Sequence, residues 1–195
     1  MGEFDLVVQA LDSYRPHDAS EVADGQRLRS CLTATDVRSR DALLHVTASA
    51  LVVHPPTRTV LLRWHPRMAM WMQVGGHFDA DETDPWLVAV REAREETGLT
   101  DLRADSRPDA RQPVQIVIVP VPAHGDEPAH EHADIRYLLA TDHPTEIVPE
   151  SGAARLRWTD ISVAVEEATE DNLREFLTRI AAILDDTARA NRGSR

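Results

Sequence analysis

The stretch that decides the fold is "GGHFDADETDPWLVAVREAREETGL", residues 75–99, which places seven acidic side chains and two arginines behind a pair of glycines. Asp84 is a favourable N-cap residue, and Pro85 suits the first position of a helix. Gly98 suits the position just past a helix end, where the left-handed conformation is common. Together these signals predict a helix over residues 85–97.

The predicted helix has an apolar face and an acidic face, because successive side chains are rotated by about 100°. The residues expected on the buried face are Trp86, Ala89, Val90, Ala93 and Thr97. Glu92, Glu95 and Glu96 gather on another side, since residues three and four apart are helical neighbours. Arg91 offsets their repulsion only in part, so the cluster favours a bound hard cation such as Mg²⁺, which prefers oxygen ligands.

The Gly75-Gly76 pair fits the same interpretation. Glycine lets the chain turn, and it lets backbone groups approach a site without interference from a Cβ atom. The N-terminus of the following helix also offers free N–H groups to an anion. The alternative is a turn followed by a solvated amphipathic helix, which would favour charges of alternating sign over three neighbouring glutamates.

The spacing of these residues resembles the signature of the Nudix hydrolase superfamily. That signature reads Gly, five residues, Glu, seven residues, then Arg-Glu-aliphatic-any-Glu-Glu-any-Gly-aliphatic. The residues that fill it here are Gly76, Glu82, Arg91, Glu92, Ala93, Glu95, Glu96, Gly98 and Leu99. The similarity extends over roughly residues 45–185.

The match departs from the signature at three places. Eight residues, rather than seven, separate Glu82 from Arg91. Ala93 stands where a larger aliphatic residue is usual, and Val74 precedes the glycines where many members carry proline. We interpret the extra residue as an insertion at the start of the helix, which keeps Gly76 and Glu82 in their signature positions.

The resemblance implies an α/β fold: a Nudix-type α/β/α sandwich with a mixed β-sheet, here with an N-terminal helical extension. It also implies a metal-dependent hydrolase that cleaves a phosphoanhydride bond in a nucleoside diphosphate linked to another moiety, by water attack at phosphorus. In this scheme Glu92, Glu95 and Glu96 hold Mg²⁺ or Mn²⁺. The Gly76 carbonyl and Glu82 are further candidate ligands.

Two residues are catalytic candidates in that scheme. Arg91 would orient a glutamate by ion pairing, and Glu95 is the first candidate for the general base that takes the proton of water. Glu146 and Glu150, before the last strand, are alternative bases. The rival function is a non-catalytic ligand-sensing domain on the same fold. An isopentenyl-diphosphate isomerase would need a reactive cysteine, and the single cysteine, Cys31, lies far upstream.

A second group of polar residues is a candidate for substrate binding. His130, His132 and Asp134 alternate along an expected strand and therefore share one face, and Arg136 follows on the same face. These side chains could bind a transition metal, but a contact with a substrate phosphate is the favoured interpretation. The remaining substrate-binding candidates are His65, Arg67 and His77, which flank the glycines, and Trp64, which could stack on a base.

The chain divides into a helical extension over residues 1–40, a hydrolase domain over 41–186 and a polar, disordered tail over 187–195. The helices expected outside the signature cover residues 3–13, 18–34 and 170–185. The expected strands cover residues 46–53 and 60–64 as a hairpin, 68–78, 112–121, 133–141 and 153–161. A dimer through residues 1–40 is possible.

The composition limits the partners of the protein. A formal net charge of −12 over 195 residues argues against long nucleic acid and anionic membranes as partners. No apolar run approaches the roughly 20 residues of a membrane span, and the acidic N-terminus does not resemble a signal peptide. We therefore expect a cytoplasmic protein with a small-molecule, nucleotide-type substrate.

Overall fold

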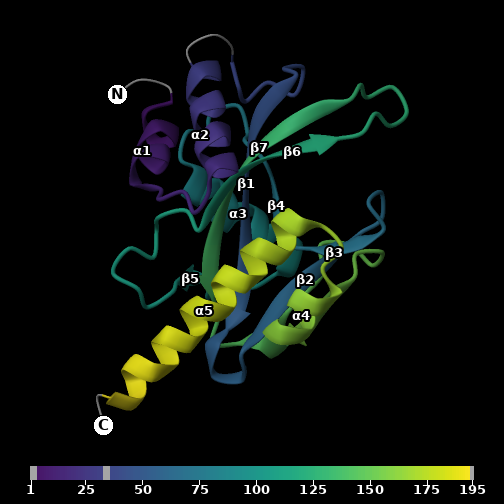
Figure 1. The fold of residues 1–195 in the computed structure, drawn as a ribbon. Coiled ribbons are helices and arrows are strands. Elements are labelled where there is room, and N and C mark those ends of the chain that lie inside the picture. The colour runs from purple at the N-terminus through teal and green to yellow at the C-terminus, as the bar shows by residue number, and fades with distance from the viewer. Residues whose placement is uncertain (1–3, 33–35, 194–195) are drawn as a thin grey trace.

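The computed structural model describes residues 4–32 and 36–193. Within them an eight-stranded mixed sheet is flanked by helices on both faces (Figure 1). The helices are α1 (Asp5–Ser13), α2 (Ala19–Cys31), α3 (Pro85–Thr97), α4 (Ile161–Glu167) and α5 (Asp171–Gly193), with short 3₁₀ turns η1 (Pro55–Thr57) and η2 (Pro144–Glu146). The strands are β1 (Leu44–His54), β2 (Thr59–His65), β3 (Met70–Met72), β4 (Val74–His77), β5 (Arg103–Ala104), β6 (Gln115–Val121), β7 (His130–Ala140) and β8 (Leu156–Asp160).

The centre of the sheet is the parallel pair β1 and β7, which stay in register from Leu44 opposite Glu131 to Val53 opposite Ala140. Both strands are buried along almost their whole length, as expected for a strand covered on two faces. Alternate residues of β1 enter different layers. One layer joins β1 to α3, and the other joins β1 to α4 and α5. The predicted α/β/α sandwich is therefore confirmed.

The predicted strand over residues 68–78 is in fact two strands with different partners. β3 pairs with β2, whereas β4 pairs with β1. β1 pairs with β4 through Thr47 to Ala50 and with β2 through Val52 to His54. β2 and β4 therefore diverge near Leu51 of β1. This fork in the sheet opens beside the two glycines, and the periodicity of one short apolar stretch could not show it.

The N-terminal extension is helical, as predicted, and it packs onto the domain. Val7, Leu11 and Leu28 belong to the same buried cluster as the inner strands. The observed helices α1 and α2 are shorter than the expected ranges 3–13 and 18–34, and residues 3, 33 and 34 lie outside the described residues. The extension is thus continuous with the core of the domain.

The C-terminal tail was predicted to be disordered from residue 187, and this was wrong as far as residue 193. Helix α5 continues to Gly193 instead of ending near residue 185. Local contacts support the extra turns: Arg189 pairs with Asp186 at 3.0 Å, and the Thr187 hydroxyl donates to the Ile183 carbonyl at 2.9 Å. Residues 194 and 195 lie outside the described residues. The domain boundaries at 40 and 186 stay predictions.

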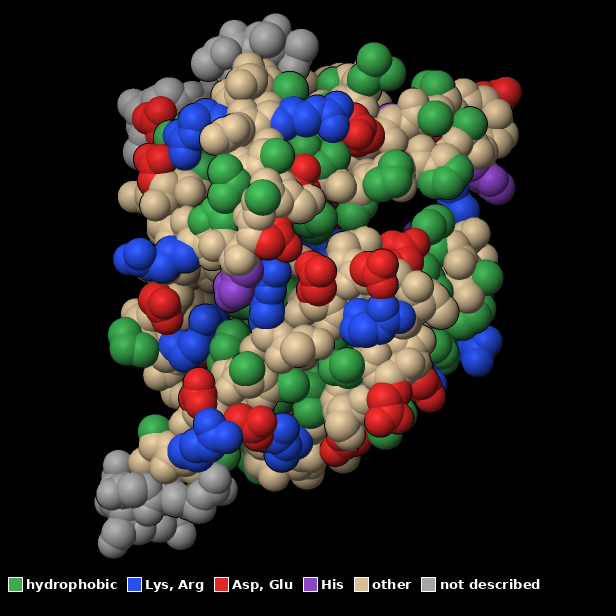
Figure 2. Space-filling model, viewed as in Figure 1, with side chains coloured by type: hydrophobic (Ala, Val, Ile, Leu, Met, Phe, Trp, Pro, Cys, Tyr) green, Lys and Arg blue, Asp and Glu red, His purple; other side chains and the backbone are tan. Residues whose placement is uncertain are grey.

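The surface mixes acidic and basic side chains over the face seen in Figure 2, without a single-sign patch that would suit a nucleic acid backbone. Among the described helices, none combines the length and apolar character that a membrane span requires.

A buried polar cluster fastens the extension to α5. Glu21, only 3% exposed, accepts a hydrogen bond from Tyr14 Oη at 2.5 Å and pairs with Arg179 of α5. Burial by itself would raise the pKa of Glu21, but the hydrogen bonds from Arg179, the His17 amide and Tyr14 outweigh it and leave this pKa below its ordinary value of 4.5. The ionised carboxylate therefore stabilises the folded state.

We expect Glu21→Gln to lower the free energy of unfolding by roughly 2 kcal/mol at pH 7, because it leaves the partly buried Arg179 without its close counter-ion. Because folding lowers the pKa of Glu21, the ionised carboxylate contributes fully to the stability of the wild type above the ordinary pKa of 4.5. This contribution is lost as the pH falls through the folded-state pKa. Urea unfolding at several pH values measures the free energy difference between variant and wild type. Glu175→Gln is the matched control, since Glu175 is half-exposed and lies 3.9 Å from Arg179. Equal stability of the two variants would contradict the assignment.

Candidate metal and substrate site

Helix α3 carries the glutamates and has the ends that the sequence predicts. Asp84 Oδ1 accepts from the Trp86 amide at 2.9 Å, and Gly98 adopts a left-handed conformation with φ of 71°. The five residues expected on the apolar face are all buried, and Val88 joins them. Glu96 is also buried, at 8% exposed, because it lies at the edge of that face and points toward β4.

The two glycines let three elements meet. Gly75 stands opposite Ser49 in β1 with φ of 151°, and a Cβ atom there would lie 2.4 Å from Ser49 Cβ. A Cβ atom on Gly76 would lie 2.5 Å from Glu92 Oε1 of α3. The glycines therefore allow both β1 and the Glu92 carboxylate to approach the β4 backbone closely.

Arg91 is the centre of a carboxylate network on the exposed side of α3. Its Nε and Nη2 atoms donate to the two oxygens of Glu82, each at 2.8 Å. Its Nη1 donates to Glu92 at 3.0 Å and to Glu95 at 2.9 Å, and Nη2 also donates to the His77 carbonyl at 2.9 Å. The hydrogen bonds from Arg91 lower the pKa of Glu82. The extra residue before the helix thus leaves Glu82 within reach of Arg91.

Glu96 and Glu92 are less readily ionised than an exposed glutamate. Burial raises the pKa of Glu96 to about 7, although Arg63 at 3.1 Å and the Gly75 amide at 3.1 Å oppose the shift. Burial also raises the pKa of Glu92, against the nearby charge of Arg91. A divalent cation would favour the ionised form of both carboxyls.

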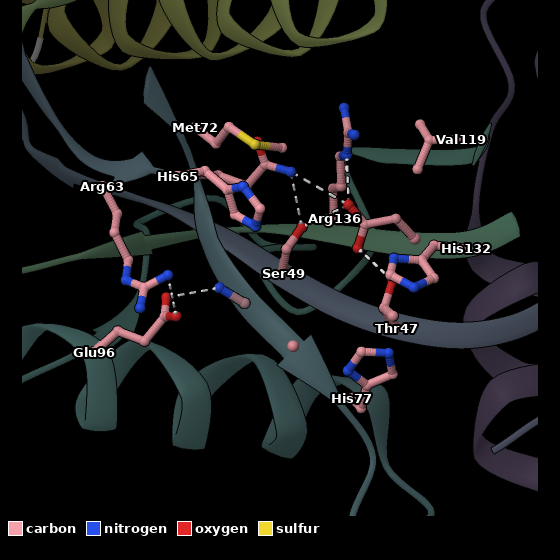
Figure 3. Close-up of a pocket in the computed structure, with 14 residues that line it drawn as sticks. Thr47, Ser49, Arg63, His65, Met72, His77, Glu96, Val119, His132 and Arg136 are labelled. Carbon is pink, nitrogen blue, oxygen red and sulfur yellow. Dashed lines mark hydrogen bonds and ion pairs between the residues drawn. The ribbon is translucent and has the colours of Figure 1, made fainter. Parts of the chain in front are cut away.

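A cavity of about 220 Å³, whose lining residues are mainly polar or charged, lies at the fork between β2 and β4. Glu96 and Arg63 line it at one end, and His77 and His132 line it at the other (Figure 3). In Figure 2 the molecule is hollowed between β6 and β3, which contribute Val119 and Met72 to the same cavity.

The wall of the cavity between these ends is a buried network around Asp134. Its carboxylate accepts hydrogen bonds from Ser49 at 2.9 Å, Thr47 at 3.2 Å and Arg136 Nε at 2.8 Å (Figure 3). Two other buried side-chain atoms at the wall, Arg63 Nε and Gln73 Oε1, have no hydrogen-bond partner among the residues that the structure describes. Such atoms are expected where a ligand or solvent supplies the partner.

The structure brings together only some of the residues predicted to bind substrate. His77 and His132 both line the cavity, and burial lowers their pKa values to about 4 and about 3, so that both rings are neutral at pH 7. His130 lies behind them, 3.1 Å from His132 between Nε2 atoms.

Arg136 also lines the cavity, although its guanidinium is tied into the cavity wall, whereas Trp64 lies elsewhere. The Arg136 guanidinium, in a side chain 2% exposed, is held by Asp134 and by the side chains of Gln115 and Asn172, each at 2.9 Å or less. Trp64 packs edge-on against Trp71 and lines a separate cavity over α4 and α5.

Sequence reasoning missed Arg63 and His45 at the site. Arg63 and His65 flank Trp64 on β2. Because successive side chains of a strand point to opposite faces, Arg63 and His65 line this cavity and Trp64 lines another. His45 was missed because it lies at the start of β1, where nothing local links it to the later histidines. Glu150, weighed only as an alternative base, lies 3.5 Å from Arg63.

The geometry can be compared with known proteins. Residues 43–180 match the model of the NUDIX domain family. An Ap4A hydrolase of C. elegans, in a binary complex, is similar at a TM-score of 0.55 and 19% identity over 72% of this chain and 98% of that one. A NUDIX-family hydrolase from Clostridium perfringens is similar at a TM-score of 0.52 and 22% identity, over 70% of this chain and 97% of that one.

A third similar structure is the dihydroneopterin triphosphate pyrophosphohydrolase of E. coli, with a TM-score of 0.52 and 20% identity over 68% of this chain and 91% of that one. No curated protein matches the sequence significantly. At these identities the likeness to solved structures concerns the fold.

The two glycines should respond differently to a methyl group. We expect Gly75→Ala to cost about 3 kcal/mol of folding free energy, since its Cβ meets the rigid backbone of β1 at a strained φ. Gly76→Ala should cost less than about 1 kcal/mol, because the atom it meets is the movable end of Glu92. Thermal and urea unfolding of both variants measure the difference, and a Gly76→Ala protein as unstable as Gly75→Ala would argue against this geometry.

Proposed function

The chain belongs to the NUDIX domain family, and from that premise we propose that it is a Mg²⁺- or Mn²⁺-dependent pyrophosphohydrolase. Its substrate would be a nucleoside diphosphate linked to another moiety, cleaved at a phosphoanhydride bond by water. The observation that carries the proposal is the position of Glu92 and Glu96, whose carboxylates both lie against the Gly75-Gly76 backbone. Carboxylate and carbonyl oxygens gathered in this way are the ligands that Mg²⁺ prefers.

The residues that would hold the metal are Glu92, Glu95 and Glu96, with the Gly76 carbonyl. When bound, the ion would neutralise diphosphate charge and polarise the phosphorus centre. We propose that Glu82 acts mainly by holding Arg91, because both of its carboxylate oxygens accept hydrogen bonds from that guanidinium.

The general base in the proposed reaction is Glu95, which is half-exposed and accepts a hydrogen bond at 2.9 Å from Arg91. A base in this position can receive a proton from water and release it to solvent. Glu150 is the second candidate because it borders Arg63 at the cavity. Glu146 is the third, and its carboxylate lies 3.7 Å from His143 on the surface.

The substrate phosphates would lie in the cavity between Glu96 and the two histidines. Arg63, His65, His77 and His132 line it, and of these Arg63 and His65 can donate hydrogen bonds to phosphate oxygens. His130 would hold His132 in place from behind, and Arg136, which also lines the cavity, would hold Asp134. Trp64 is left out of this proposal, since it lines a different cavity.

The composition supports a proposal for the substrate class of the enzyme. The net charge of −12 suits a small nucleotide-type substrate bound through a metal better than a long nucleic acid. We propose a cytoplasmic enzyme. Dimerisation through residues 1–40 stays a prediction.

Activity should be sought with a panel of phosphoanhydrides, with Mg²⁺ and Mn²⁺ in turn. The panel includes ADP-ribose, nucleotide sugars and nucleoside triphosphates, together with Ap4A and dihydroneopterin triphosphate, after which two of the similar structures are named. Glu95→Gln and Glu96→Gln should each lower kcat by about 10²- to 10⁴-fold, because they remove a proton acceptor or a metal ligand.

Glu175→Gln, on the exposed side of α5, is the control and should keep wild-type activity. Failure to hydrolyse any compound, together with unchanged nucleotide binding in both site variants, would favour the ligand-sensing function over the enzyme.

The roles proposed for Glu82 and Glu92 can be separated by metal binding. We expect Glu92→Gln to weaken Mn²⁺ binding at least tenfold, while Glu82→Gln changes the affinity by less than about threefold, because only Glu92 would contact the ion directly. Electron paramagnetic resonance of free Mn²⁺ measures both affinities without substrate. Equal losses in the two variants would make Glu82 a ligand.

A further inference from the structure

Four histidines from three strands meet at one end of the sheet. His45 of β1 stands opposite His132 of β7, and His77 of β4 stands opposite Thr47, two residues along from His45. His130 precedes His132 by two residues, so all four side chains share one face of the sheet. The ring centroids of His45 lie 4.7 to 5.1 Å from those of the other three rings.

Three of the rings are arranged as ligands of one ion would be. Ligand nitrogens of His45, His77 and His132 all lie within 4.8 Å of one another, and the Nε2 atoms of His45 and His77 are 3.1 Å apart. Two nitrogens bound tetrahedrally to Zn²⁺ at the usual 2.0–2.1 Å lie roughly 3.3 Å from each other. The His45–His77 spacing is close to this value, and the other two pairs exceed it by no more than about 1.5 Å.

Backbone carbonyls orient two of the rings toward the centre of the cluster. His45 Nδ1 lies 3.0 Å from the Ala42 carbonyl, and His130 Nδ1 lies 2.9 Å from the Pro128 carbonyl. A carbonyl oxygen only accepts, so each Nδ1 carries the proton and each Nε2 presents its lone pair to the neighbouring histidine. Ligating histidines commonly have this arrangement, with the second ring nitrogen donating to a carbonyl.

The cluster also differs chemically from the glutamate site. It offers neutral nitrogens, which suit Zn²⁺, Ni²⁺ or Co²⁺, whereas Mg²⁺ prefers oxygen. Without an ion, the His45–His77 and His130–His132 pairs can each share one hydrogen bond. That leaves four partly desolvated polar rings in a space that apolar side chains would fill at lower cost.

We propose that His45, His77 and His132 form a binding site for a borderline divalent transition metal, with Zn²⁺ as the reference ion, distinct from the glutamate site. His130, whose Nε2 lies 3.1 Å from that of His132, is a candidate fourth ligand. Because His77 and His132 line the cavity, the ion would lie in its wall, at the end away from Glu96 (Figure 3).

The site can be tested with Co²⁺ as a spectroscopic probe. The full chain, freed of metal with a chelator, is titrated with Co²⁺ in excess Mg²⁺, so that the oxygen ligands are occupied. We expect one Co²⁺ per chain with the intense visible absorption of tetrahedral coordination, displaced by Zn²⁺. His77→Ala and His132→Ala should each lower the affinity at least tenfold and weaken the band.

Two controls separate this site from other ligands. His54→Ala changes the histidine at the opposite end of β1, and Glu96→Gln changes the other end of the cavity; both should keep the wild-type affinity and spectrum. Absence of the band in the wild type, or unchanged affinity in His132→Ala, would overturn the proposal whatever the hydrolase activity.

If the histidine variants fail to fold, as judged by circular dichroism, X-ray absorption spectroscopy of the Zn²⁺-loaded wild type identifies the ligands of the ion instead. Imidazole scattering from three or more histidines would support the site, and an oxygen-only shell would overturn it.

Discussion

The ion pairs of Arg91 hold the acidic side of α3 together. Glu92 and Glu95 on one helix would repel each other, and Glu82 brings a third carboxylate from the loop. A single guanidinium contacts all three, because its planar fork presents several donors in fixed directions. The same fork reaches the His77 carbonyl, so it also ties the helix to the end of β4.

This contact between α3 and β4 brings the glutamates of the helix close to the residues that line the cavity. β4 pairs with β1 through two glycines. Because these residues have no side chain, Glu92 and Glu96 can approach the strand from the helix side. On the opposite side of the same strands, the β1–β7 register arranges His45, His132 and Asp134. The cavity lies where these two sides meet, at the fork between β2 and β4.

The local features of the sequence proved good guides to local structure. The capping residues of α3 lie where the sequence puts them, and the family resemblance is confirmed over residues 43–180. Predictions that depended on more distant contacts did less well. Arg136 was expected to contact substrate, and it does line the cavity, but the buried network that holds it to Asp134 and Asn172 was not foreseen. The tail from residue 187 was expected to be disordered, but α5 continues to Gly193.

The sequence by itself determined the helix with its carboxylate face, the glycine pair before it and the alternating polar strand, because periodicity and capping act over a few residues. Only the tertiary structure decided that Arg63 meets Glu96 and that His45 joins His77 and His132. These residues are separated by tens of positions along the chain, and they meet because the pairing of long strands fixes which side chains stand opposite. Strand register is set by the packing of the whole sheet, so it cannot be read from any one segment.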